Sequence, residues 1–394
     1  MLFQTFDDKE KCHMVYENGE FHNNLTPSCT KTWSYANYMK NREDIEYASL
    51  FVAEKSLADI SMTIAGSQFQ EIQDRIKAII KTSMQAGLDL NEVCIYDLIP
   101  RHYLVKLANI KDRICQEVFD NYEKPVNYEQ LLKIVKVITD IKTKPVEIDV
   151  SKIARVTVQD KNIYNLLNKC VPIVDYDMTK TVTARLSTKK DTFPVMTLAK
   201  KYRNVIAPTN NWFFEMDFNA CELRTALALL GQKQPEEDLH DWNLTHVFTR
   251  AKSRDNAKKR IFAWLYNPNS SDDKISDIYD RKKLKDLYYD GKKIVTPFGR
   301  KIKCDEDHAI SYLVQSTAAD LMFEQMYKLW KYLDGKMSFI KFCNHDSIMI
   351  DLHMDQELEF HQMKQLFSDT RFGKFRVNSF GGTNWADMKQ LLIK

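Results

Sequence analysis

The most constraining feature of the sequence is the segment from Trp212 to Gly231, which has the pattern of a buried strand followed at once by a helix. Its apolar start, Trp212-Phe213-Phe214, predicts the strand, and Asp217 stands where that strand should end. Asn219 is expected to begin the helix and Gly231 to follow its last turn. The apolar stripe of this helix consists of Ala220, Leu223, Ala226, Leu227 and Leu230. A carboxylate between a buried strand and a helix start is well placed to bind a divalent cation, so Asp217 is a candidate metal ligand.

A second candidate ligand lies in residues 339–351, which have the pattern strand, polar tip, strand. Asp346 stands at the tip. A carboxylate between buried strands is costly without a partner of opposite charge, and a metal ion is the natural partner. The alternative is a surface turn in which Asp346 only caps the backbone. We adopt the hypothesis that Asp217 and Asp346 together hold the metals for phosphoryl transfer.

A third signal comes from Arg254, Lys258, Phe262 and Tyr266, which follow one another at steps of four. On a helix such residues lie along one band, and Pro268 would end that helix. Two cations and two aromatic rings do not form an ordinary core stripe. The cations can hold a triphosphate and the rings can stack on a base.

Composition limits the alternatives without choosing among them. The chain has 394 residues, enough for two or three subdomains, and its net charge of +3 is too small to indicate a nucleic-acid partner by itself. The eight cysteines are scattered without a CxxC pair, which argues against a zinc site or a disulfide scaffold and fits a reducing compartment. The sequence has no apolar run of membrane-spanning length and no signal peptide, so we expect a cytoplasmic protein without a membrane partner.

The remaining elements are expected as follows. Residues 1–50 read as a small β-rich or irregular region, with a strand at 12–16 and a turn at 17–19. Helices are predicted at 68–84, 103–119, 128–141, 242–250, 308–329 and 355–367, with a short exposed helix within 271–293. Strand pairs are predicted at 181–188 and 294–301. Asn219 and Glu222 have the spacing of a helix capping box.

Taken together, these motifs resemble the family A DNA polymerases of the bacterial polymerase I type over residues 176–390. Asp217-Phe218-Asn219-Ala220-Cys221-Glu222-Leu223-Arg224 resembles motif A, the band from Arg254 to Tyr266 resembles the fingers helix, and His345-Asp346 resembles motif C. Three shorter elements also match: Thr183-Ala184-Arg185-Leu186-Ser187, Thr296-x2-Gly299-Arg300, and Gln315-x-Thr317-Ala318-Ala319-Asp320. Each motif is weak alone, but six in collinear order are specific.

The resemblance implies an α+β right-hand fold with an antiparallel palm sheet, a helical thumb and reduced helical fingers. The implied regions are 1–50 as a small N-terminal part, 51–175 as thumb, 176–232 as the first part of the palm, 233–295 as fingers and 296–394 as the second part of the palm. The implied activity is DNA-directed DNA polymerase, a nucleotidyltransferase that extends a primer with dNTPs by two-metal phosphoryl transfer.

The resemblance also implies roles for single residues. Asp217, Asp346 and the Phe218 carbonyl would ligate two Mg²⁺ ions, with Mn²⁺ as a substitute, and Lys258 would contact the triphosphate and protonate the leaving pyrophosphate. Arg203, His240 and Arg254 would hold phosphates, Phe262 would stack on the nucleotide, and Tyr266 would pack at the template site. Glu222 would act as a steric gate against a ribose 2′-hydroxyl. The residues implied to touch the primer-template are Arg185, Arg300, Gln315 and His345.

The short N-terminal region leaves no room for the 3′–5′ exonuclease domain of the family, so no intrinsic proofreading is expected. A compact enzyme of this kind resembles viral replicative polymerases. It would be a monomer in the host cytoplasm that works with primer-template DNA, dNTPs, other replisome proteins and a separate exonuclease.

The sequence departs from the family pattern at several positions. Ser347 replaces the Glu that usually ends motif C, so the third carboxylate is missing, while Asn267 and Ala184 each replace a Gly. Asp307 and Ser311 stand where Arg and Asn are usual. Two other hypotheses are a single-subunit RNA polymerase of the same superfold, which a bulky Glu222 disfavours, and a degenerate polymerase kept as a DNA-binding replisome scaffold, which the retained Asp217 and Asp346 disfavour.

Overall fold

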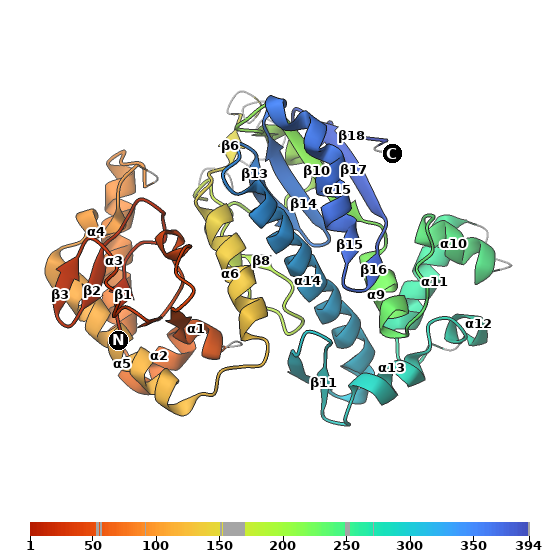
Figure 1. Cartoon of the computed structure of the whole chain (residues 1–394), viewed down its shortest axis with the longest axis horizontal. Helices are drawn as coiled ribbons and strands as arrows, with labels where there is room; N and C mark the ends of the chain where they lie inside the picture. Colours follow the sequence, from red (N-terminus) through yellow and green to blue (C-terminus); the bar gives the residue numbers. More distant parts are fainter. Residues whose placement is uncertain are drawn as a thin grey trace. The chain divides into compact units, whose positions relative to one another are not determined.

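The computed structural model describes all residues except 53, 54, 56, 91, 150, 151, 153–169, 249–252, 271, 393 and 394. Contacts divide the chain into two compact units, Met1–Thr143 and Lys144–Lys394 (Figure 1). None of the helices formed by the described residues is both long and apolar enough to cross a membrane.

The first unit packs small sheets against long helices around a shared core that includes Trp33, Ala48 and Ile114. Its sheets are β1 (Gln4–Thr5), β2 (Val15–Glu17) and β3 (Glu20–His22), which pair antiparallel, and β4 (Lys31–Thr32) and β5 (Glu46–Tyr47), which pair parallel. Its helices are η1 (Asn37–Met39), α1 (Ala48–Phe51), α2 (Leu57–Ala65), α3 (Gln68–Gln85), α4 (Ile95–Leu98), α5 (Arg101–Asn121) and α6 (Tyr128–Lys142). The helices predicted at 68–84, 103–119 and 128–141 are confirmed. The predicted turn is also present: Asn18 and Gly19 both have positive φ, as a tight two-residue hairpin requires.

One prediction from the cysteines is wrong. Cys12 and Cys94 form a disulfide, although they are 82 residues apart in the sequence. The spacing of cysteines along the chain could not reveal this pair, because the fold brings the segment before β2 next to the segment before α4. Asp7 lies beside them and accepts a hydrogen bond from the Ile95 amide at 2.9 Å.

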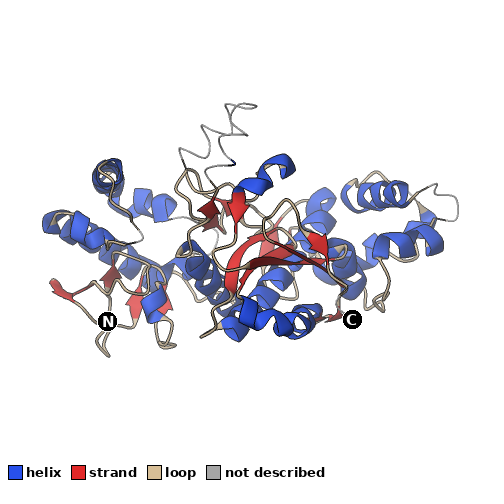
Figure 2. Cartoon of the chain, turned by 90° about the horizontal axis from the view of Figure 1, so that it is seen from above, coloured by secondary structure: helices blue, strands red, loops and turns tan. Residues whose placement is uncertain are grey.

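The second unit is built on a five-stranded antiparallel sheet in the order β13-β14-β10-β17-β18, seen in red among the helices in Figure 2. The strands are β13 (Phe339–Asn344), β14 (Ser347–Leu352), β10 (Trp212–Phe218), β17 (Val377–Gly382) and β18 (Lys389–Gln390). The central strand β10 turns Phe214 and Phe218 toward α15 (Phe360–Ser368), where they pack on Phe360 and Phe367 with ring centroids 4.6 and 4.2 Å apart. Because side chains alternate along a strand, Asp217 points to the opposite face.

Helices extend from both sides of this sheet. They are η2 (Lys200–Val205), α9 (Cys221–Leu229), α10 (Leu239–His246), α11 (Arg254–Tyr266), α12 (Asp273–Ser276), α13 (Arg281–Tyr288), α14 (Glu306–Leu333) and η3 (Met354–Glu359). Short strands complete the unit: β6 (Glu147–Ile148) with β9 (Ile206–Ala207), β7 (Tyr176–Asp177) with β8 (Ser187–Thr188), β11 (Lys293–Val295) with β12 (Lys301–Lys303), and β15 (Asp369–Thr370) with β16 (Gly373–Lys374).

The structure corrects two local predictions in this unit. Only Ser187–Thr188 of the predicted strand pair at 181–188 is a strand, because Ala184 adopts a left-handed conformation (φ 59°) and its amide bonds back to the Thr181 carbonyl in a turn. The helix predicted at 242–250 is α10, which starts earlier because Asp238 caps it, and residues 249 and 250 lie outside the described residues.

Candidate functional site

Strand pairing brings the two predicted metal ligands together. Asp217 on β10 is the register partner of Ser347 on β14, and Asp346 precedes Ser347 in the two-residue turn from β13. The Phe218 amide donates a hydrogen bond to the Asp346 carbonyl at 3.1 Å, which ties the turn to the end of β10. His345 occupies this turn with φ 58°.

A buried tyrosine that the sequence did not reveal holds the same hairpin from the other side. The Tyr176 hydroxyl donates to the Cys343 carbonyl at 2.5 Å and accepts from the Cys343 amide at 2.9 Å. Both bonds lie in the interior, where hydrogen bonds are least exposed to competition from water. Tyr176 therefore fixes the strand that presents His345 and Asp346.

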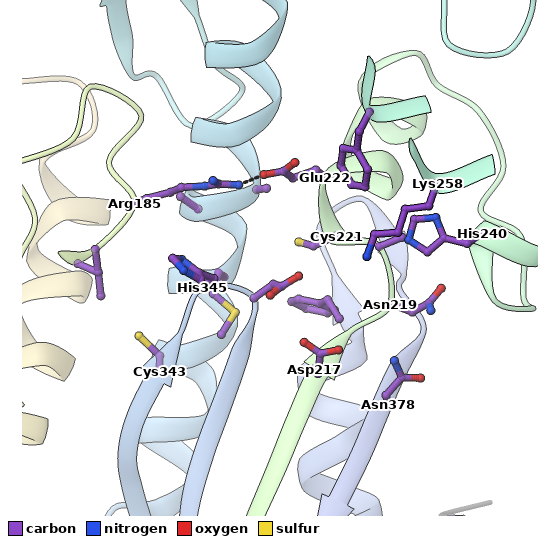
Figure 3. A pocket seen from close by; sticks show the side chains of 18 of the residues that line it. Arg185, Asp217, Asn219, Cys221, Glu222, His240, Lys258, Cys343, His345 and Asn378 are labelled. Carbon is purple, nitrogen blue, oxygen red and sulfur yellow. Dashed lines mark ion pairs between the residues drawn. The ribbon is translucent and has the colours of Figure 1, made fainter. Parts of the chain in front are cut away.

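The two aspartates lie in a cavity of about 400 Å³. The cavity is surrounded by the five-stranded sheet and by helices α9, α10, α11 and α14. The predicted site residues that line it are Arg185, Asp217, Phe218, Glu222, His240, Arg254, Lys258, Phe262, His345 and Asp346. In Figure 3, Asp217 lies beside the hairpin that carries His345, and Lys258 and His240 reach toward the cavity from the helices opposite. Carboxylates on one wall thus face cations on the other.

The chemistry of the acidic wall fits a divalent cation. Burial, together with the neighbouring charges of Asp346 and Glu215, raises the pKa of Asp217 to about 8, although a hydrogen bond from Asn378 acts in the opposite direction. Burial also raises the pKa of Asp346. These two half-buried carboxylates are difficult to ionise because too little positive charge lies near them, and a bound metal ion would supply that charge. Asn378, the register partner of Asp217 on β17, is a site residue that the sequence analysis missed.

The raised pKa of Asp217 predicts how the stability of the metal-free protein depends on pH. The unfolded chain releases the Asp217 proton near pH 4, whereas the folded metal-free protein keeps it until about pH 8. Stability should therefore fall as the pH rises through this window and level off above it. We expect the metal-free Asp217→Asn protein to melt at least about 2 °C above wild type at pH 8, with a smaller gain at pH 5.

The measurement is thermal melting in chelator at both pH values. Saturating Mg²⁺ should remove the advantage of the variant at pH 8 by stabilising only the wild type. The exposed Asp334→Asn substitution serves as a control for removal of one carboxylate. An equal gain at pH 5 and pH 8 would contradict the assigned pKa.

The cationic wall is organised by Asp238, which the sequence analysis did not assign to the site. Its carboxylate caps α10 by accepting from the His240 and Asp241 amides, and it holds the Arg254 guanidinium at 2.8 and 3.2 Å. Arg254 itself begins α11, where Ser253 is the N-cap. The signal was available in the sequence, since Asp is a preferred N-cap residue directly before a helix.

His240 is neutral in this wall. Burial, together with the charge of Arg254, lowers its pKa to about 4. Within the described residues its buried Nδ1 has no hydrogen-bond partner. Buried polar atoms are rarely left unpaired, so this nitrogen is suited to a ligand that enters the cavity.

Glu222 does not act as the predicted capping residue. The N-cap of α9 is Ala220 with φ 52°, and the side chain of Asn219 instead accepts from the Leu239 amide at 2.9 Å and donates to Asp238 at 2.7 Å. The Glu222 carboxylate forms an ion pair with Arg185 and accepts a hydrogen bond from the Tyr266 hydroxyl. Burial and the charge of Asp346 raise its pKa to about 7.

The two aromatic residues of α11 differ in position. The Phe262 ring faces the cavity and stacks nearly parallel on Tyr266, with centroids 5.8 Å apart and planes at 13°. Tyr266 lies outside the residues that line the cavity and reaches the site through Glu222. The stack and this contact fix the end of α11 against α9.

Three further predicted residues are not part of the cavity lining. Arg203 lies over the Trp385 ring at 4.0 Å, and Arg300 forms a buried two-point ion pair with Asp320 at 2.6 and 3.0 Å. Gln315 lies on α14 and is half-buried. The Arg300 pair ties β12 to α14, so its observed role is structural.

Comparisons with known proteins agree with this architecture. No protein-family model and no curated protein matches the sequence. Among solved structures, the chain is similar to the POL domain of Pol1 from M. smegmatis, a structure in complex with DNA primer-template and dNTP. The TM-score is 0.65 at 11% identity, over 98% of this chain and 96% of that one. The likeness confirms the predicted α+β polymerase fold, and at this identity it establishes the fold alone.

Proposed function

We propose that this chain is a template-directed DNA polymerase that adds dNTPs to a primer 3′ end. The observation that carries the proposal is that one cavity is lined by Asp217 and Asp346 together with Lys258. Such a site can bind a group that is both metal-chelating and strongly anionic, and a nucleoside triphosphate is such a group. The polymerase fold raises the weight of this function over other phosphoryl transfers.

The acidic wall would hold the metal. Mg²⁺, or Mn²⁺ in its place, would activate the primer 3′-hydroxyl and neutralise charge on the α-phosphate when held by Asp217, Asp346 and the Phe218 carbonyl. Asn378 would orient Asp217 through its hydrogen bond. The tie between Phe218 and the Asp346 backbone would keep the two carboxylates on adjoining strands at a fixed spacing.

The cationic wall would hold the triphosphate. Lys258 and Arg254 would contact phosphate oxygens, and Lys258 would pass a proton to the leaving pyrophosphate. The unpaired Nδ1 of His240 would accept or donate one further hydrogen bond there. Phe262 would stack on the incoming base. Arg203 remains a predicted phosphate contact that would have to leave its place on Trp385.

The primer-template would lie against Arg185 and His345, which line the same cavity. Arg185 would exchange its ion pair with Glu222 for contact with DNA. Gln315 stays a predicted DNA contact, whereas Arg300 would act indirectly by holding β12 on α14 through Asp320.

Glu222 would discriminate deoxyribose from ribose. The Tyr266 hydroxyl would hold its side chain in place after Arg185 has turned to the DNA, so Glu222 would not easily yield to a 2′-hydroxyl. We expect the Glu222→Ala protein to use rNTPs about 10- to 100-fold better relative to dNTPs than wild type, as measured by the ratio of kcat/KM values in single-nucleotide incorporation.

The matched control is Glu222→Gln, which keeps the size of the side chain and can still accept the Tyr266 hydrogen bond. Discrimination should survive in this variant if the block is steric. If the wild-type protein incorporated rNTPs as efficiently as dNTPs, the result would instead support the RNA polymerase hypothesis.

The proposal as a whole is tested by primer extension with the purified chain, Mg²⁺ and one dNTP at a time on four templates that differ in the next base. We expect incorporation of the complementary nucleotide only, and none after chelation. No extension with either Mg²⁺ or Mn²⁺ would overturn the proposal in favour of a DNA-binding scaffold. The predicted lack of proofreading is tested in parallel: hydrolysis of single-stranded DNA that is lost in Asp217→Ala would contradict it.

A further inference from the structure

The sheet holds an acidic residue that the roles assigned so far do not use. Glu215 lies on β10 two positions before Asp217, so both side chains are on the same face of the strand. It is half-buried and does not belong to the residues that line the cavity. It is therefore the next side chain along the strand from Asp217 on that face, outside the cavity lining.

Ser347 connects Glu215 to the other aspartate. The Ser347 hydroxyl donates to Glu215 Oε1 at 2.9 Å, across the β10–β14 ladder. Ser347 pairs in register with Asp217, and Glu215 pairs with Met349, so the bond joins diagonal neighbours on one face of the sheet. Because Ser347 directly follows Asp346 and is the first residue of β14, this hydrogen bond restrains the backbone next to Asp346.

A carboxylate at this position has a cost that a neutral residue would avoid. It adds a third carboxyl group to a partly buried site that already holds two, and these groups repel one another when they are ionised. Glutamine or threonine could also accept from Ser347 without this repulsion. The charges of Arg203 and Lys200 act on Glu215 by lowering its pKa, but no salt bridge from Glu215 to either residue within 4.0 Å is found among the described residues. The charge itself therefore calls for an explanation.

We propose that Glu215, held by Ser347, supplies the third carboxylate of the metal site from strand β10, in place of the acid that motif C lacks at position 347. Glu215 is a positioning residue: it increases the negative field at Asp217 and, through Ser347, orients Asp346. Residues that support metal ligands in this way commonly change metal affinity by about 10- to 100-fold. The inference rests on the proposed metal-binding function of Asp217 and Asp346.

The test measures Mn²⁺ binding to the full chain by electron paramagnetic resonance, with a dideoxy-terminated primer-template and dNTP so that no turnover occurs. Glu215→Gln keeps an acceptor for Ser347 and removes only the charge, and we expect it to weaken Mn²⁺ binding about 10- to 100-fold. Ser347→Ala keeps the charge and loses the tether, so its loss should be smaller.

The decisive variant is Glu215→Gln combined with Ser347→Glu, which moves the carboxylate to the neighbouring strand. We expect this double variant to bind Mn²⁺ within about threefold of wild type. A purely structural role for Glu215 predicts the opposite pattern, with no loss in Glu215→Gln. Unchanged binding in that variant, or no recovery in the double variant, overturns the proposal.

Two controls separate this inference from the proposed function. Thermal melting identifies any variant that fails to fold, and if Glu215→Gln is unfolded, comparison of the double variant with Ser347→Ala still tests where the charge is needed. Asp217→Asn shows that the measured Mn²⁺ is at this site. Normal primer extension with unchanged metal affinity in Glu215→Gln would refute only the role of Glu215. Weakened Mn²⁺ binding in Glu215→Gln, combined with a wild-type protein that extends no primer, would refute only the proposed polymerase activity.

Discussion

Primer extension by the Asp346→Ala protein is expected to fall at least about 10³-fold in kcat. The reason is that Asp346 supplies one of the two carboxylates proposed to hold the metal in the cavity, and charge stabilisation by a catalytic metal contributes several kcal/mol to a phosphoryl transfer. Single-turnover incorporation of one correct dNTP in Mg²⁺ measures the loss directly.

The substitution should leave the fold intact, because it removes a carboxylate whose pKa burial raises and whose charge the metal-free protein does not favour. Primer-template affinity and melting temperature should therefore stay close to wild type. Asp334→Ala, at an exposed carboxylate after the end of α14, provides the matched control. Activity of Asp346→Ala within tenfold of wild type would refute the assignment of the metal site.

The second large effect is expected for Lys258→Ala, with a loss of about 10²- to 10³-fold in kcat/KM for dNTP. Lys258 lines the cavity from α11, and its charge acts on both Asp217 and Asp346 by lowering their pKa values against the effect of burial. Removing it should weaken contact with the triphosphate and also slow departure of pyrophosphate.

Two neighbouring variants make this prediction specific. Lys259→Ala removes a cation at the next position of the same helix, outside the cavity lining, and should change kcat/KM less than about threefold. Lys258→Arg restores the charge but cannot readily give up a proton, so it should recover KM more fully than kcat. Equal recovery of both constants would mean that Lys258 acts through charge alone.

The chain shows clearly which features follow from local pattern. The band from Arg254 to Tyr266 predicted α11, since residues four apart on a helix share a side and Pro268 follows the segment. The strand–tip–strand pattern around Asp346 predicted β13 and β14, and the apolar run at Trp212 predicted β10. Each of these patterns is contained in a short continuous stretch of the sequence, a few helical turns or one or two strands long.

The sequence was wrong or silent where a contact joins distant segments. Glu222 and Asn219 have capping-box spacing. In the structure, however, Asn219 hydrogen-bonds to Asp238 and Glu222 forms an ion pair with Arg185, so both side chains bind partners from other elements instead of capping α9. The Cys12–Cys94 disulfide and the hydrogen bonds of Tyr176 to Cys343 also join residues that no local pattern links.

By itself, therefore, the sequence determined most elements and the candidate carboxylates, because periodicity and turn chemistry are local properties of the chain, and it indicated the fold class through the resemblance of its motifs to family A DNA polymerases. Only the tertiary structure decided which groups meet: Asp217 beside Asp346, Asn378 opposite Asp217 on the neighbouring strand, and Glu215 bonded to Ser347. Strand register sets these meetings, and register depends on long-range pairing that no short stretch of sequence encodes.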